Sequence, residues 1–204
     1  MPRPLVLACG ALVSELRTVL KASGFTDHVD VRYLPANLHN RPSHIVPSLR
    51  ALLEELDPLA ERPVLIGYAD CGTGGGLDAL LDEMPRLQRL PGNHCYEFFS
   101  GTAVFEAMQE DELGTFYLTD FLAKHFEALL WQGLGLDRHP ELLPMYFSNY
   151  TRVMLLSQTT DESVIAAGRL AAERLGLRFE HLHVGFAPFA EAVSVNLTSH
   201  RKVV

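Results

Sequence analysis

The chain has 204 residues, 48% hydrophobic and 21% charged, with a formal net charge of −8. These values are ordinary for a globular protein with one full core, and the scattered Lys and Arg residues disfavour nucleic-acid binding, which needs a clustered basic surface. No apolar run approaches the ~20 residues that span a bilayer, and the start lacks a signal-peptide pattern, so we expect no membrane association and a cytoplasmic location.

Apolar runs alternate with helical spacings along the first half of the chain. The pattern predicts strands at 4–10, 28–35 and 63–70, and helices at 11–25, 45–61 and 77–84. Gly24 is placed to end the first helix. A glycine-rich loop follows the third strand, and residues 86–101 show no regular pattern.

The second half repeats this alternation. The pattern predicts strands at 115–120, 152–158 and 177–186, and helices at 103–114, 121–136, 141–150 and 159–176. Thr159 and Glu162 have the spacing of a capping box, and Gly176 is placed to end that helix. Thr119 or Asp120 is expected to cap the helix that follows it.

Strands that alternate with helices indicate parallel pairing through right-handed crossovers. We therefore predict an α/β layered fold with a mainly parallel sheet. We expect one domain over residues 1–193 and a polar tail over 194–204. In such sheets ligands bind at the carboxyl ends of the strands, where Cys9 and Cys71 are expected to lie together.

Three cysteines carry the chemistry that the sequence suggests. An odd number argues against a disulfide framework, and Cys9, Cys71 and Cys95 with His94 are the residue types that bind soft or borderline metals. Three thiolates suit an iron–sulfur cluster with one open iron, and His94 could complete a zinc site instead. The alternatives are a metal-free reactive thiol with His94 as catalytic base, and buried structural cysteines.

The loop after Cys71 is a second candidate. Its glycines could cradle a phosphate with their amides, but a P-loop Lys-Ser/Thr pair is absent and Leu77 breaks the dinucleotide pattern. We expect instead that a cofactor approaches the backbone closely there. The glycines concerned are Gly72, Gly74, Gly75 and Gly76.

The segment Asp137, Arg138 and His139, before Pro140, is interpreted as a turn between helices, with a ligand role as the alternative.

The segments GYADCGTGG, PGNHCYEFFSG, GTFYLTDF and GLGLDRHPEL together resemble the domain-of-unknown-function family 1638, over about residues 3–190. Cys71, and Cys95 with His94, occupy the places of the family's two cysteine elements, and Cys9 fits its early ACG element. Family members are often encoded near corrinoid-dependent methyltransferases and their reductive activators. The resemblance thus implies a role in methyl transfer or cobalt handling.

Together these observations predict a cysteine-site metalloprotein of corrinoid-dependent or one-carbon methyl metabolism. The expected cofactor is an iron–sulfur cluster, with zinc as the alternative, and the expected partner is a corrinoid protein or its methyltransferase, besides an unidentified small-molecule substrate. Two further hypotheses are a non-catalytic partner-binding module and a metal-free thiol enzyme. Apolar helix faces could also form a homo-oligomer.

Overall fold

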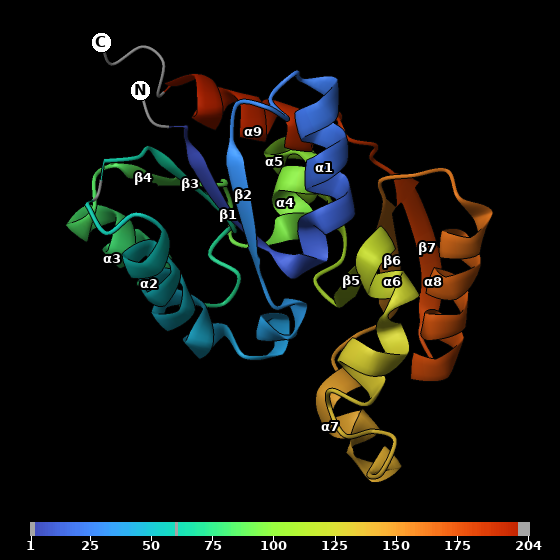
Figure 1. The fold of residues 1–204 in the computed structure, drawn as a ribbon. Helices are drawn as coiled ribbons and strands as arrows, with labels where there is room; N and C mark the ends of the chain where they lie inside the picture. The colour runs from blue at the N-terminus through green and yellow to red at the C-terminus, as the bar shows by residue number, and fades with distance from the viewer. Residues whose placement is uncertain (1–2, 60, 200–204) are drawn as a thin grey trace. The chain divides into compact units, whose positions relative to one another are not determined.

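The computed structural model describes residues 3–59 and 61–199, and every strand pair described is parallel (Figure 1). This confirms the predicted layered α/β fold. Contacts group the chain into two compact units, residues 1–98 with 186–204 and residues 99–185. Each unit has its own sheet, and the single domain predicted for 1–193 stays a prediction.

The first unit contains a four-stranded sheet in the order β2-β1-β3-β4. Its strands are β1 (Leu5–Cys9), β2 (Asp30–Leu34), β3 (Val64–Gly67) and β4 (Leu87–Arg89). Ala8 of β1 pairs with Tyr33 on one side and Gly67 on the other. β3 is buried along its whole length, as expected for a parallel strand with helices on both faces.

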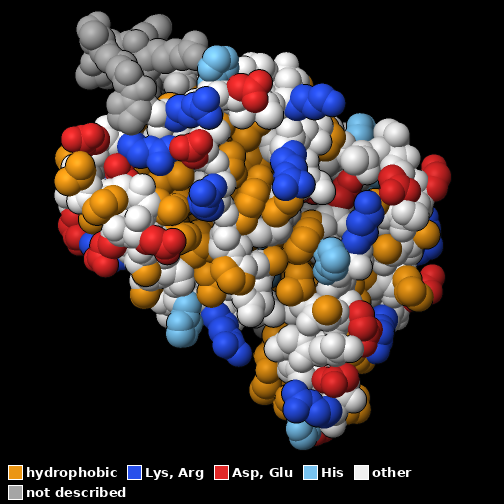
Figure 2. Space-filling view, viewed as in Figure 1, with side chains coloured by type: hydrophobic (Ala, Val, Ile, Leu, Met, Phe, Trp, Pro, Cys, Tyr) orange, Lys and Arg blue, Asp and Glu red, His pale blue; other side chains and the backbone are white. Residues whose placement is uncertain are grey.

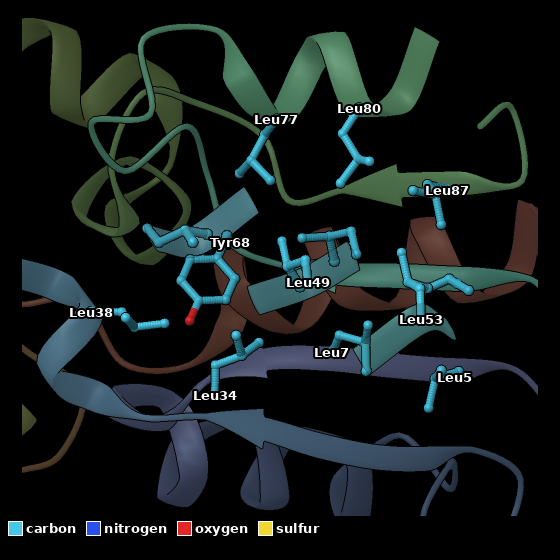
Figure 3. Close-up of a cluster of buried hydrophobic side chains, with 13 residues drawn as sticks. Leu5, Leu7, Leu34, Leu38, Leu49, Leu53, Tyr68, Leu77, Leu80 and Leu87 are labelled. Carbon is cyan, nitrogen blue, oxygen red and sulfur yellow. The ribbon is translucent and has the colours of Figure 1, made fainter. Parts of the chain in front are cut away.

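Helices cover both faces of this sheet (Figure 1). The helices and 3₁₀ turns of the unit are η1 (Gly10–Leu12), α1 (Val13–Ala22), η2 (Ala36–Asn40), η3 (Pro42–His44), α2 (Ile45–Leu56), α3 (Gly76–Glu83) and α9 (Ala187–Ser199), and α4 (Cys95–Ser100) begins in it. Leucines of α2 and α3 pack onto one face in a single apolar cluster (Figure 3). α1 and α9 contact each other on the opposite face.

The C-terminal segment differs from the predicted polar tail. Residues 194–199 continue α9, and Leu197 is 2% exposed, so its burial holds this part of the helix in the fold. The rest of the predicted tail, 200–204, lies outside the described residues.

The second unit contains a three-stranded sheet in the order β5-β6-β7. Its elements are α5 (Thr102–Asp111), β5 (Thr115–Thr119), α6 (Asp120–Lys124), a π-turn η4 (Glu127–Trp131), η5 (Pro140–Leu142), α7 (Leu143–Phe147), β6 (Arg152–Ser157), α8 (Glu162–Leu175) and β7 (Arg178–His183). The central strand β6 is buried throughout, and α8 packs on β6 and β7.

The long helix predicted over 121–136 is wrong. α6 ends at Lys124, and the backbone then widens into the π-turn, where the N–H of Gln132 donates to the carbonyl of Glu127. Gly135 adopts a left-handed φ of 76°, which a regular helix does not allow. The widened path lets Leu136 reach a buried position (2% exposed).

Helix caps were predicted with mixed success. The Thr119 side chain caps α6 by accepting from the N–H of Leu122, as expected. The capping box at Thr159 is wrong, because Asp161 caps α8 and the Thr159 hydroxyl donates to Asp120 instead. Gly176 ends α8 in the left-handed conformation, as predicted.

On the face shown in Figure 2, Lys and Arg side chains of the described residues are interspersed with Asp and Glu. Within the part of the chain that the structure describes, no helix combines the length and the apolarity needed to cross a membrane.

Candidate functional site

The three cysteines lie at the carboxyl ends of three neighbouring strands. Cys9 is the last residue of β1, Cys71 follows β3, and Cys95 begins α4 after β4. Since β1, β3 and β4 are adjacent in the sheet, their loops leave it at one edge. The charge of Cys9 acts on the Cys71 thiol, and the charges of Cys9 and Cys71 both act on the Cys95 thiol.

Backbone hydrogen bonds join the loop of Cys71 to the turn that leads into α4. The N–H of Asp70 donates to the carbonyl of Gly92 at 3.1 Å, and the N–H of Cys71 donates to the carbonyl of Asn93 at 2.8 Å. Arg89 also donates to the Gly92 carbonyl, at 3.0 Å. The spacing between the Cys71 and Cys95 backbones is therefore fixed by the fold.

Burial raises the pKa of each thiol. It raises the pKa of Cys71 to about 12, helped by the charge of Cys9 and opposed by the N–H groups of Ala69 and Cys95. Burial, and then the charges of Cys71 and Cys9, raise the pKa of Cys95 well above its usual value. The pKa of Cys9 rises mainly through burial, although the N–H of Ala11 donates to its sulfur at 3.4 Å. Three thiolates here repel one another unless a cation lies among them.

Tyr68 places a buried hydroxyl beside the sulfur of Cys9. Its side chain is 2% exposed, its ring packs among the core leucines, and its hydroxyl points toward Leu34 and Leu38 (Figure 3). That hydroxyl is buried, and its polar neighbour is the Cys9 sulfur. Burial raises the pKa of Tyr68, followed by the charge of Cys9, the hydrogen bond between the phenol and the Cys9 thiol, and the charge of Cys71. A neutral phenol of this kind can donate to a thiolate or sulfide that appears in the site.

Tyr68 was not predicted as a site residue. The one available signal was its position three residues before Cys71, at the end of a buried strand.

The two histidines near the site have different surroundings. His94 is exposed and directly precedes Cys95. His39, in η2 after β2, was also not predicted, and burial followed by the charge of His94 lowers its pKa. The structure therefore brings His94 near a mostly neutral imidazole and leaves it accessible to solvent.

The conformation of the glycine loop is held by hydrogen bonds to the Asp70 carboxylate. The Asp70 carboxylate accepts from the N–H of Gly74 at 3.1 Å, from the N–H of Gly75 at 2.9 Å, and from the Thr73 hydroxyl at 2.6 Å. Burial opposes ionisation, but these hydrogen bonds and Arg89 together lower the pKa of Asp70. The amides that could hold a phosphate already bind a carboxylate of the same chain.

The glycines themselves are explained by backbone conformation. Gly72, Gly74 and Gly75 have positive φ, and a Cβ on Gly74 or Gly75 would meet nothing within 4 Å, while Gly76 begins α3. Another part of the backbone comes close to Gly10, next to Cys9: a Cβ at this position would lie 2.6 Å from the Leu34 carbonyl oxygen.

The segment from Asp137 to His139 is a solvent-exposed turn, and Pro140 begins η5 after it. This supports the interpretation as a turn between helices.

The model of the family described as Protein of unknown function (DUF1638) matches residues 33–193. The chain belongs to the DUF1638 family. The match includes Cys71, His94 and Cys95, whereas Cys9 lies before it. Comparisons with curated proteins and with solved structures gave no match.

Among the described residues, no three His, Cys, Asp or Glu side chains are arranged to hold one metal ion. A zinc ion needs its sulfurs about 2.3 Å from one centre. The thiolates that bind an iron–sulfur cluster ligate different irons, so they need not meet at one point.

We expect the metal-free DUF1638 protein to alkylate slowly with iodoacetamide until the pH exceeds about 10, whereas the unfolded chain reaches half its maximal rate at roughly pH 8.5. Because the folded state holds these protons more tightly, the thiols contribute stability that is present at neutral pH. This stability is lost as the pH rises toward the Cys71 pKa of about 12. Mass spectrometry of native and unfolded protein across this range measures both rates. Native alkylation at pH 7 as fast as in the unfolded chain would contradict the burial of the thiols.

Proposed function

We propose that the protein binds an iron–sulfur cluster through Cys9, Cys71 and Cys95 and acts in cytoplasmic corrinoid-dependent or one-carbon methyl metabolism. The observation that supports this proposal is the position of the three cysteines, each at or after the carboxyl end of one of three neighbouring strands of one sheet. They come from three different loops, and two of these loops are hydrogen-bonded to each other.

The surroundings of the thiols fit a bound cationic group. Iron would supply the positive charge that three thiolates need, and the buried Tyr68 hydroxyl beside Cys9 could donate to the Cys9 sulfur once that sulfur is a bound thiolate. When bound, a cluster with three protein thiolates supplies electron transfer and one iron free for another ligand. The exposed His94 is available as that ligand or as an acid or base toward substrate.

Zinc and metal-free catalysis fit less well. Zinc would require the three thiols, or two of them with His94, to converge on one point, and the described side chains do not. A thiol nucleophile needs a lowered pKa, but burial raises the pKa of all three cysteines. No observation favours the hypothesis of a purely non-catalytic binding module.

The assignment to methyl metabolism rests on the family resemblance. The partner it suggests is a corrinoid protein or its methyltransferase. Electron delivery to a cobalt centre is a reaction that an iron–sulfur cluster can perform, which makes the two parts of the proposal consistent.

Single Cys9→Ser, Cys71→Ser and Cys95→Ser variants test the cysteine assignment. After anaerobic iron and sulfide reconstitution, we expect each to retain less than about a quarter of the iron of the unaltered protein, since a cluster rarely survives on two thiolates. The His94→Ala variant serves as the matched control and should keep its iron if three thiolates suffice. Full iron content in all three cysteine variants, with native circular dichroism, would overturn the proposal.

A further inference from the structure

Two histidines lie together at the carboxyl end of the second sheet, outside the cysteine site. His183 is the last residue of β7, and His181 precedes it by two positions. Successive side chains of a strand point to opposite faces, so these two imidazoles share one face. β7 is at the edge of the sheet described, and both histidines are exposed to solvent.

Ser157 brings the two imidazoles to a common point. It is the last residue of β6, and its Cα is paired with that of His183. The Ser157 hydroxyl oxygen lies 2.8 Å from Nε2 of His181 and 3.2 Å from Nδ1 of His183. Ser157 is 0% exposed, so the oxygen lies at the inner end of the pair and the imidazoles lie between it and solvent.

This arrangement directs one ring nitrogen of each imidazole to a single oxygen. The Ser157 hydroxyl can donate to one imidazole and accept from the N–H of the other, which holds the two rings with these nitrogens close together. A cation in the same place would accept the lone pairs of both His181 and His183. Neutral imidazole is the commonest metal ligand among side chains and suits zinc, copper and nickel.

We propose that His181 and His183 bind one divalent transition-metal ion of the zinc class, through Nε2 of His181 and Nδ1 of His183, with the Ser157 hydroxyl as an additional oxygen donor. Two neutral imidazoles and a hydroxyl favour such an ion over magnesium or calcium, which prefer carboxylate oxygens. No third His, Cys, Asp or Glu joins them among the described residues, so the remaining positions are open to water or to a ligand.

A serine hydrolase dyad would use the same residues and is disfavoured by burial. A nucleophilic serine must reach its substrate, and the Ser157 side chain is fully buried beneath the histidines. The exposed groups are the imidazoles, which are the groups that a metal ion from solvent would meet first.

Zinc titration of the full-length protein by calorimetry tests the site. We expect the His181→Ala/His183→Ala double variant to bind about one zinc ion fewer than the unaltered protein, with no loss of reconstituted iron. The double variant His28→Ala/His44→Ala, which removes two exposed histidines elsewhere, should bind zinc like the unaltered protein. Ser157→Ala should weaken this binding by about tenfold, as loss of a supporting ligand does. Equal zinc stoichiometry and affinity in the His181/His183 variant and the unaltered protein would overturn the proposal.

Cobalt spectra separate this site from the cysteines. Bound Co²⁺ should give visible bands without the sulfur-to-metal charge transfer that thiolate ligands produce, and these bands should vanish in the His181→Ala/His183→Ala variant. Persistence of the same bands in that variant would assign the ion elsewhere and contradict the proposal.

Discussion

Replacing Arg152 with alanine is expected to lower the free energy of unfolding by about 3–5 kcal/mol. The Arg152 side chain is 4% exposed, and its guanidinium donates to Asp111 at 2.9 Å, to Glu180 at 2.8 Å and to the Thr115 hydroxyl at 2.8 Å. Alanine would remove the buried charge that joins Asp111, Glu180 and Thr115, leaving the exposed Arg178 beside Glu180, and would leave a cavity beside β6. Urea denaturation followed by circular dichroism measures the loss.

Arg178 supplies the matched control for this prediction. It contacts Glu112 and Glu180 in the same group of charges, but its side chain is 56% exposed. Exposed ion pairs contribute little, so Arg178→Ala should lower the free energy of unfolding far less than Arg152→Ala does. Equal losses in the two variants would show that burial of Arg152 does not determine the stability of the second unit.

Asp120→Ala is expected to lower the free energy of unfolding by about 3 kcal/mol or more, because Asp120 joins the ends of β5 and β6. Its buried carboxylate accepts from the N–H of Gln158 at 2.9 Å, and from the N–H and hydroxyl of Thr159 at 3.0 and 2.5 Å. Alanine would leave these donors buried without an acceptor. Thermal and urea unfolding of the variant give the loss directly.

The exposed helix cap Asp161 is the control for Asp120. It accepts from the N–H of Ser163 at 2.9 Å, and its replacement by alanine should remove only this exposed cap and so lower the free energy of unfolding much less. If Asp120→Ala lowers the free energy of unfolding no more than Asp161→Ala does, the buried hydrogen bonds of Asp120 do not stabilise the protein as we propose.

The sequence predicted the fold class and most elements because strands and helices left clear periodicities. It could not show that the strands divide between two sheets, since an apolar run does not record its pairing partner. The helix predicted at 121–136 failed for a related reason. Its apolar spacing fits both a regular helix and a chain that widens at Glu127 and turns at Gly135.

The cysteine site was partly visible in the sequence. Cys9 and Cys71 follow apolar strands, which suggested a common edge, and the structure has those strands side by side. Tyr68 and His39 were not predicted because their part in the site depends on which way a buried side chain points. The glycines after Cys71 were predicted to give a cofactor close access, but an Asp70 hydrogen-bond network and positive φ angles account for them.

The central claim is that Cys9, Cys71 and Cys95 hold an iron–sulfur cluster. The most direct test is to measure the iron, the sulfide and the optical spectrum of anaerobically purified protein. We predict a brown protein with about four iron and four sulfide per chain and a broad charge-transfer band at about 400 nm that dithionite bleaches. A colourless protein that takes up no iron and sulfide on anaerobic reconstitution, while its three thiols remain reduced, would contradict the account.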